Sequence, residues 1–257
     1  MEPPSKAGPD IIEAHTGKPP LKRMFDAVPK RYDFLNRLLT LRLDQRWRRR
    51  AAEWCLRPGP RHVLDLCCGT GDLAFQLADM AEEHVEITGL DFSPAMLQAA
   101  RKKAEKADYA RPIGFVEGNC SAMDFPGAHF DSVGIAFAFR NVTWRNPLAE
   151  ETLAEVRRVL RPGGRFVIVE TSQPTNRILR AVFHGYFRAV VAPVGGWISG
   201  HKAAYRYFRE SACNFYNHQE VSSMLGRAGF ENIRVETLAG GVAAIHVASK
   251  PETNTIP

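Results

Sequence analysis

Residues 61–74 read Arg-His-Val-Leu-Asp-Leu-Cys-Cys-Gly-Thr-Gly-Asp-Leu-Ala, and this stretch decides the fold class of the 257-residue chain. Its apolar part, residues 62–66, predicts a buried strand, and the glycines that follow predict a tight turn into a helix. Gly69 and Gly71 carry no Cβ, so the backbone of this turn can approach a ligand closely. The pattern therefore predicts a strand, a ligand-binding turn and a helix in direct succession.

The same alternation continues along the chain. Strands are predicted at 62–67, 85–90, 113–117, 131–137 and 164–170, and helices at 72–81, 94–107 and 147–160. The turn Arg161-Pro162-Gly163-Gly164 is expected to end the third helix. A helix near 218–228 and two strands, 231–238 and 242–249, close the chain. We expect an α/β fold with a Rossmann-like, mostly parallel sheet, a C-terminal antiparallel hairpin and helices on both faces.

The domain organisation is expected to be simple. The proline-rich residues 1–20 predict a disordered arm without a secretory signal, and residues 251–257 predict a loose tail. Between them, residues 21–250 are expected to form one domain, with a helical cap at 21–56 and a helical insertion at 174–211. The insertion contains no apolar run long enough to span a bilayer. It could form a lid over an apolar substrate, a helix lying on a membrane, or an ordinary packed helix.

Charge and cysteine content restrict the setting. The net charge is +6, and part of it is a run of arginines at positions 42, 46, 48, 49 and 50. Such a run is compatible with an anionic membrane surface, with nucleic acid, or with a solvated helix face. The five cysteines are odd in number and lack C-x-x-C spacing, which favours a reduced cytoplasmic protein without a metal site.

The acids that flank the glycine turn indicate its ligand. Asp65 and Asp72 would oppose a pyrophosphate and favour a cationic ligand, and S-adenosylmethionine is such a ligand. Gly69-x-Gly71-x-x-Ala74 also fits the dinucleotide pattern, and Asp91 would suit the ribose of either ligand. A hydride-transferring dehydrogenase is therefore the rival class, and Asp72 argues against it. The predicted donor-binding residues are Asp65, Gly69, Thr70, Gly71, Asp72, Asp91, Phe92, Asn119 and Cys120. Asn119 could equally be a turn residue after Gly118.

Four motifs then resemble one known family. They are Met24-Phe25-Asp26 with Tyr32-Asp33-x-x-Asn36 and Trp47-Arg48-Arg49, then Asp65 to Asp72, then Phe139-Arg140-Asn141-Val142-Thr143, and finally Arg157 to Gly164 with Glu170-x-Ser172. Together they resemble the C-methyltransferases of menaquinone and ubiquinone biosynthesis, which are class I S-adenosylmethionine-dependent enzymes. In this resemblance Cys120 stands in place of an alanine, Thr40 of a serine and Asp44 of a histidine.

The resemblance implies methylation of a ring carbon on a polyprenylated quinol, of the demethylmenaquinol type, with Thr70, Asp91, Asn119 and Cys120 contacting the donor. A quinol carbon becomes nucleophilic when its hydroxyl loses a proton. We therefore expect Arg140 to stabilise developing negative charge and Asn141 to orient the hydroxyl, while Tyr32 and Asp33 close the cap over the substrate. Alternatively, Arg140 pairs with a carboxylate such as Asp33, and the cap residues only pack.

The expected partner is a lipophilic quinol substrate, and no nucleic acid is expected. Peripheral association with the inner face of the membrane and a homodimer are both left open. Two other functions remain open: a related methyltransferase with another small aromatic or lipid substrate, and a non-catalytic donor-binding subunit of a quinone-biosynthesis assembly.

Overall fold

One seven-stranded sheet organises the protein. The computed structural model describes residues 37–57, 59–107, 112–199 and 202–252. In chain order the strands are β1 (His62–Leu66), β2 (Glu86–Asp91), β3 (Gly114–Glu117), β4 (Phe130–Ala136), β5 (Leu160–Thr171), β6 (Glu231–Leu238) and β7 (Ala243–Ser249).

The strands lie in the order β3-β2-β1-β4-β5-β7-β6. The first five pair in parallel, whereas β7 lies between β5 and β6 and is antiparallel to both. The predicted mostly parallel sheet with a C-terminal antiparallel hairpin is confirmed. Because parallel strands end at the same edge, the loops that follow β1 to β4 meet there, and this is where ligands bind in such sheets.

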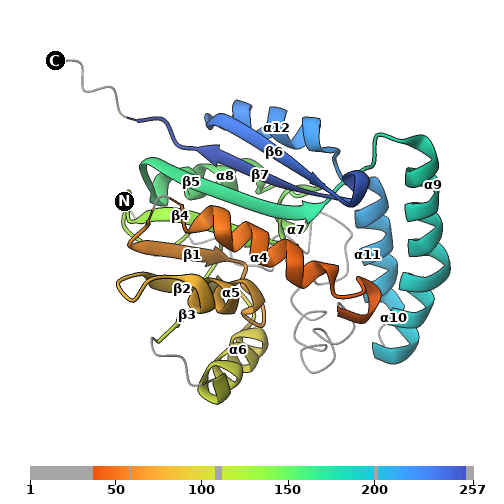
Figure 1. Ribbon diagram of the computed structural model, residues 1–257, viewed down its shortest axis with the longest axis horizontal. Coiled ribbons are helices and arrows are strands. Elements are labelled where there is room, and N and C mark those ends of the chain that lie inside the picture. The colour runs from red at the N-terminus through yellow and green to blue at the C-terminus, as the bar shows by residue number, and fades with distance from the viewer. Residues whose placement is uncertain (1–36, 58, 108–111, 200–201, 253–257) are drawn as a thin grey trace, which may run out of the picture.

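Helices cover both faces of the sheet, as Figure 1 shows. Successive residues of a strand point to opposite faces of the sheet, so β1 contributes Leu64 and Leu66 to one apolar layer and Val63 to the other. Helices α8 and α12 pack into the first layer, and α4 and α5 into the second. The helices around the sheet are α4 (Leu43–Cys55), α5 (Asp72–Met80), α6 (Pro94–Ala107), α7 (Phe139–Thr143), α8 (Ala149–Val159) and α12 (His218–Arg227).

The segment that follows β5 folds into a group of helices beyond the carboxyl ends of the parallel strands (Figure 1). It comprises α9 (Arg177–Tyr186), the π-helix η1 (Phe187–Val191), α10 (Ala192–Ser199) and α11 (Lys202–Asn214). The Asn176 side chain begins α9 by accepting hydrogen bonds from two backbone N–H groups of its first turn. Phe183, Phe187, Val191 and Tyr205 form the core of this group together with Leu39 from the cap.

Two local features differ from the sequence prediction. The residues Arg161 to Gly164, expected as a turn, extend β5 from Leu160, directly after α8. Instead of ending the chain segment in a turn, Pro162 and Gly163 shift the register in which β5 pairs with β4. The φ angle of Gly163 is 73°. The short helix α7 was not predicted as an element, because five residues are too few to show helical periodicity.

Candidate active site

The glycine turn lies at the carboxyl edge of the sheet, between β1 and α5. Three of its residues have positive φ angles, 55° at Cys67, 55° at Gly69 and 86° at Gly71. A Cβ built on Gly69 would meet no atom within 4 Å, so its Cα faces open space. The backbone of Gly69 can therefore be approached by a ligand, which is what the sequence pattern required.

Asp91 ties this turn to the end of β2. Its carboxylate accepts the N–H of Gly69 at 2.8 Å and the N–H of Ser93 at 2.9 Å. Asp91 and Thr70 are buried, and Phe92 beside Asp91 is half-buried. The structure thus brings Thr70, Asp91 and Phe92 to the same edge as Gly69.

Asp65, the last polar residue of β1, is buried beneath the turn. Its carboxylate accepts the N–H of Ala74 at 2.9 Å and so joins β1 to the first turn of α5. Burial raises the pKa of Asp65 to about 8, because the charged form loses its hydration. At neutral pH this carboxyl is therefore mostly protonated.

Asp72 is not the free anion that the sequence argument assumed. Its carboxylate lies 2.8 Å from Nζ of Lys103 and 3.4 Å from a guanidinium nitrogen of Arg37. Burial disfavours its charge, but Arg48, Lys103 and Arg37 outweigh burial and hold the pKa of Asp72 below its usual range. With Asp72 neutralised by partners and Asp65 by a proton, the two acids repel a phosphate far less than the sequence suggested. Local charge alone therefore does not choose between the two ligands.

Asn119 and Cys120 follow β3 and close the other side of this edge. The Asn119 side-chain oxygen accepts hydrogen bonds from both the N–H (3.0 Å) and the hydroxyl (2.9 Å) of Ser121, as a turn residue does. The Cys67 thiol donates a hydrogen bond to Cys120, which lowers the pKa of Cys120 and raises that of Cys67. The segment after β3 is thereby packed onto the glycine turn.

An apolar cavity of about 590 Å³ lies beside the segments that follow β4 and β5, where Phe137, Arg140 and Thr171 line it. Its walls come from the cap, α7, α9, η1 and α11, and the residues that line it include Leu39, Leu43, Trp47, Phe137, Leu179, Phe183, Tyr186, Phe187, Tyr207 and Phe208. Arg140 and Asn141, both predicted from the sequence, line it from α7. A lid over an apolar substrate was one of the three alternatives for the insertion at 174–211. Individual aromatic side chains of α9 and α11 were not assigned to the site, because their spacing is that of any packed helix.

The cavity and the glycine turn are joined through one side chain. The Gln45 amide donates to Asp44, which lines the cavity, at 3.0 Å and to Asp72 in α5 at 3.1 Å. Asp44 was not among the predicted site residues. The arginine run around it is only partly solvated, since Arg48 is buried against Asp44 and Arg50 pairs with Glu53 and Glu236.

Arg140 is buried and is hydrogen-bonded through Nε and Nη1. Its guanidinium lies 2.6 Å from Glu170 and also donates to Ser211 at 3.0 Å and Thr171 at 3.1 Å, with Phe208 packed on its face. The alternative that Arg140 pairs with a carboxylate therefore describes the structure, but the partner is Glu170 of β5. Tyr32 and Asp33 lie outside the described residues. Glu170 was missed as a partner because it lies 30 residues from Arg140.

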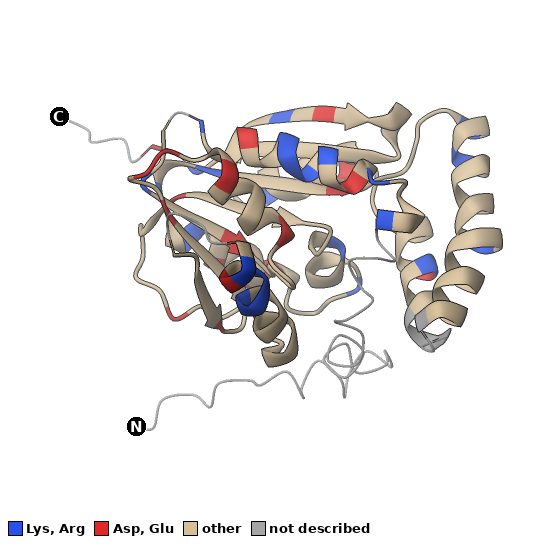
Figure 2. Ribbon diagram, turned by 60° about the horizontal axis from the view of Figure 1, so that its bottom comes forward, with Lys and Arg blue, Asp and Glu red and all other residues tan. Residues whose placement is uncertain are grey.

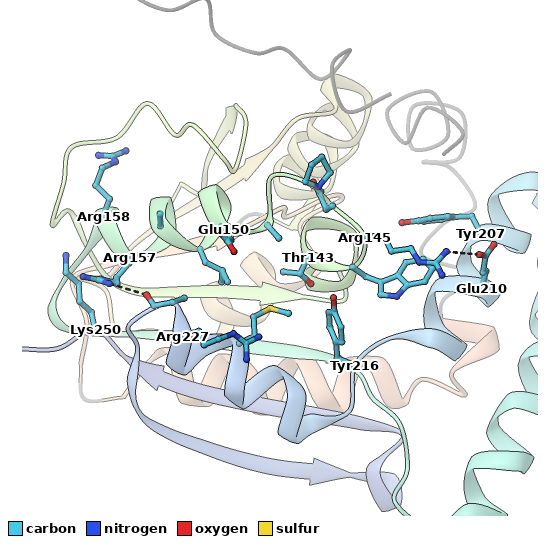
Figure 3. Close-up of a pocket in the computed structure, with 18 of the residues that line it drawn as sticks. Thr143, Arg145, Glu150, Arg157, Arg158, Tyr207, Glu210, Tyr216, Arg227 and Lys250 are labelled. Atoms are coloured by element: carbon cyan, nitrogen blue, oxygen red, sulfur yellow. Dashed lines mark hydrogen bonds and ion pairs between the residues drawn. The ribbon is translucent and has the colours of Figure 1, made fainter. Parts of the chain in front are cut away.

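A second cavity, larger and more open, lies on the side of α8 and α12. It measures about 1790 Å³, and Figure 3 shows Arg145 beside Glu210 at one end and Arg157 with Lys250 at the other. None of the predicted site residues lines it. We therefore place the candidate active site at the apolar cavity and the glycine turn.

Comparison with known proteins decides the family. The profile of the ubiE/COQ5 methyltransferase family matches residues 13–250. The chain belongs to this family. It is thus a methyltransferase, and the dehydrogenase alternative is excluded.

Individual relatives agree with this assignment. A demethylmenaquinone methyltransferase of Thermus thermophilus is 44% identical over 228 residues, which cover 89% of this chain and 100% of the relative. A ubiquinone/menaquinone biosynthesis C-methyltransferase of Geotalea uraniireducens is 36% identical over 230 residues, 90% of this chain and 96% of the relative.

Solved structures share the fold of this methyltransferase. An O-methyltransferase family protein from Burkholderia thailandensis aligns with a TM-score of 0.62 at 18% identity, over 87% of this chain and 60% of that one. A SAM dependent methyltransferase from Aquifex aeolicus aligns with a TM-score of 0.54 at 18% identity, over 95% and 99% of the two chains. At these identities the likeness concerns the fold alone.

Proposed function

We propose that this methyltransferase transfers a methyl group from S-adenosylmethionine to a ring carbon of a polyprenylated quinol, of the demethylmenaquinol type. The observation that carries the proposal is the apolar cavity next to the glycine turn, in a chain whose relatives are named demethylmenaquinone methyltransferase. A volume of about 590 Å³ is within the range of small-molecule sites.

The residues at the glycine turn fit the donor. Gly69 faces open space in which an adenosyl group could pack, and the Asp91 carboxylate at the end of β2 would accept ribose hydroxyls. Asn119 and Cys120 would border the adenine from the segment after β3. The donor supplies a methyl group on a sulfonium, and the chain has to hold that group in line with the ring carbon and keep water out.

The cavity fits an aromatic ring that carries an apolar chain. Its aromatic and aliphatic walls would surround the ring and the first isoprene units, while Arg140 and Asn141 would face a ring hydroxyl. The Arg140 charge is balanced by Glu170, so Arg140 would act as a fixed hydrogen-bond donor to the oxygen on which negative charge develops. The Asn141 amide has no hydrogen-bond partner on its side chain among the described residues, which leaves it available to orient that hydroxyl.

We further propose that the protein docks on the membrane through the rim of this cavity. Leu41 and Val182 line the cavity yet are 79% and 63% exposed, and Ile178 and Trp197 on α9 and α10 are 77% and 82% exposed. Helix α9 carries arginines and no acidic residue, as Figure 2 shows. An apolar rim with basic neighbours is typical of a surface that lies in the headgroup region. Within the described residues, no helix is both long and apolar enough to cross a bilayer.

Vesicle co-sedimentation tests this docking. Ile178→Asp and Trp197→Asp should lower binding to vesicles that contain an anionic phospholipid, because both remove apolar area from the rim. Neither residue lines the cavity, so methylation of a detergent-solubilised quinol should persist. Val235→Asp, at a 39% exposed position on β6, is the matched control. Equal binding by all three variants and the wild type would contradict the docking.

A substrate panel tests the function. The protein is incubated with methyl-labelled S-adenosylmethionine and demethylated naphthoquinols, benzoquinols and simple phenols, and the products are analysed by mass spectrometry. Transfer to a prenylated quinol supports the proposal. Transfer to simple phenols alone would favour another aromatic substrate, and donor binding without any transfer would favour a donor-binding subunit.

A further inference from the structure

Asp44 is the feature of the apolar cavity that the family assignment leaves without a role. It is the one carboxylate among the described residues that line the cavity, and it is 2% exposed. It belongs to the first turn of α4, which places it between the cavity and the glycine turn. A buried anion in an apolar cavity is costly unless its environment is built to hold it.

Three donors hold the Asp44 carboxylate in a defined orientation. The Thr40 hydroxyl donates to Oδ1 at 2.7 Å, while the Gln45 amide and the Arg48 guanidinium donate to Oδ2 at 3.0 Å and 2.5 Å. An ionised carboxylate offers about four acceptor positions, two on each oxygen. Among the described residues Oδ2 is therefore saturated, whereas Oδ1 retains one acceptor position.

Methylation at a ring carbon requires an acceptor of this kind. The hydroxyl of a phenol is weakly acidic at rest, with a pKa of about 10. Its acidity rises steeply as the ring carbon bonds to the methyl group, because positive charge then develops on the ring and its oxygen. A carboxylate in hydrogen-bond reach can accept the proton at that moment, although it could not remove it beforehand.

Other groups around the cavity are poor acceptors. Arg140 cannot accept the proton, because a guanidinium carries only N–H donors and no acceptor atom. Burial raises the pKa values of Tyr186 and Tyr207, so both keep their protons near neutral pH. The Tyr186 hydroxyl is moreover used as a donor to the Leu39 carbonyl at 2.7 Å.

We propose that Asp44 is the general base that accepts the ring hydroxyl proton during methyl transfer. The proposal rests on the proposed function, since it assumes a quinol in the cavity. The hydroxyl proton moves to Oδ1 of Asp44, and the electron pair of the O–H bond moves into the ring. The ring carbon forms its bond to the methyl group, and the pair of the broken carbon–sulfur bond stays on sulfur. The methylated carbon then loses its hydrogen as a proton to solvent, Asp44 returns its own proton to the ring oxygen, and the quinol is restored.

A pH profile separates this role from a structural one. Asp44→Asn should lower kcat by about 100- to 10,000-fold, because an amide cannot accept the proton, while the affinity for S-adenosylhomocysteine, measured by calorimetry, stays within about twofold. Asp44→His should restore part of the rate. The acid limb of its kcat/KM profile should lie at higher pH than that of the wild type, because an imidazole is more basic than a carboxylate.

The titratable groups that could distort this profile line the same cavity as Asp44 or share the Gln45 amide with it. They are Arg48 on α4, Asp72 on α5, Arg140 on α7, Tyr186 on α9, and Tyr205 and Tyr207 on α11. These residues are the same in the wild type and in Asp44→His. The displacement of the acid limb between the two proteins therefore reports the substituted side chain.

The control is Asp79→Asn, a matched substitution at an exposed position of α5, which should keep wild-type kcat. Asp44→Asn within about threefold of the wild type would overturn the proposal. So would an Asp44→His profile that superimposes on that of the wild type, whether its rate is low or high. If the wild type methylates no quinol at all, the proposed function fails and this proposal fails with it.

Discussion

The buried ion pair between Arg140 and Glu170 makes the sharpest quantitative prediction. Both side chains are 4% exposed and their charged atoms are 2.6 Å apart. Removing one partner of a buried pair leaves an uncompensated charge, which costs about 3–5 kcal/mol. After Arg140→Met, Glu170 still accepts the backbone N–H of residue 140 and the N–H and hydroxyl of Thr171. We therefore expect a cost near the lower end, about 3 kcal/mol.

Glu170→Gln should cost a similar amount, about 3 kcal/mol, because the guanidinium then keeps only its neutral acceptors. The double variant leaves no unpaired charge, so its total cost should also be about 3 kcal/mol rather than the sum of the single costs. The coupling free energy should thus be about 2–3 kcal/mol. Urea unfolding of the four proteins measures it, provided that the m-value is unchanged.

Additive single costs, or single costs below about 1 kcal/mol, would refute this reasoning about the buried pair. The same cycle separates stability from catalysis. If the double variant regains stability but remains inactive, the Arg140 charge is needed for turnover. If it regains both, Arg140 only supports the wall of the cavity.

Three further predictions follow from single side chains. Gly69→Ala should weaken binding of S-adenosylhomocysteine in calorimetry, because the new methyl group fills the open space beside the turn. The control Gly59→Ala also adds a Cβ at a positive φ and should leave the affinity unchanged. Equal affinities of the two variants would contradict the placement of the donor. The donor ammonium should bind near Asp65 and displace the proton of its carboxyl, so close to one proton should be released at pH 7 and less at pH 9, since the pKa of Asp65 is about 8. Calorimetry in buffers of different ionisation enthalpy detects this proton release, and Asp65→Asn should abolish it. Burial lowers the pKa of His246 to about 4, so the unfolded chain binds the proton more readily, and up to about 3 kcal/mol of stability should be lost as the pH falls from 6.5 to 4. His246→Gln should flatten this dependence in urea unfolding, and an unchanged slope would contradict it.

The fold was largely readable from local sequence. Six of the seven strands begin and end within one residue of the prediction, because turn residues bound most of them and β1, β4 and β7 are short, largely apolar runs. The exception is β5, where Pro162 and Gly163 look like a turn but are accommodated by a shift in pairing with β4. Neighbouring strands decide that outcome, and a local pattern does not contain them.

The site was readable only in part. The glycine turn, Asp91 and Arg140 were found because their chemistry follows directly after predicted strands. The partners that set their charge were not found: Lys103 reaches Asp72 from α6, and Glu170 reaches Arg140 from β5. These pairs join residues about 30 positions apart in the sequence. The argument that Asp65 and Asp72 select a cationic donor holds for isolated acids, but it does not hold once tertiary contacts neutralise their charge.

Asp44 is a site residue that the local sequence did not reveal. In sequence it is one acid within an arginine-rich helix start, and a solvated ion pair with Arg48 is the simplest interpretation. In the structure α4 lies across the sheet and buries both side chains, with Asp44 at the cavity wall. Only the packing of the cap against α7, α9 and α11 shows that this carboxylate faces an apolar cavity.

The central claim is that the apolar cavity holds a quinol whose ring carbon receives the methyl group. The most direct measurement uses S-adenosylmethionine with a ¹³C-labelled methyl group and a reduced, short-chain demethylmenaquinol, and locates the label in the product by NMR. The account predicts a methyl signal bonded to a ring carbon, with loss of the ring hydrogen at that position. A label bonded to oxygen, or no transfer to the quinol by a protein that binds both ligands, would contradict it.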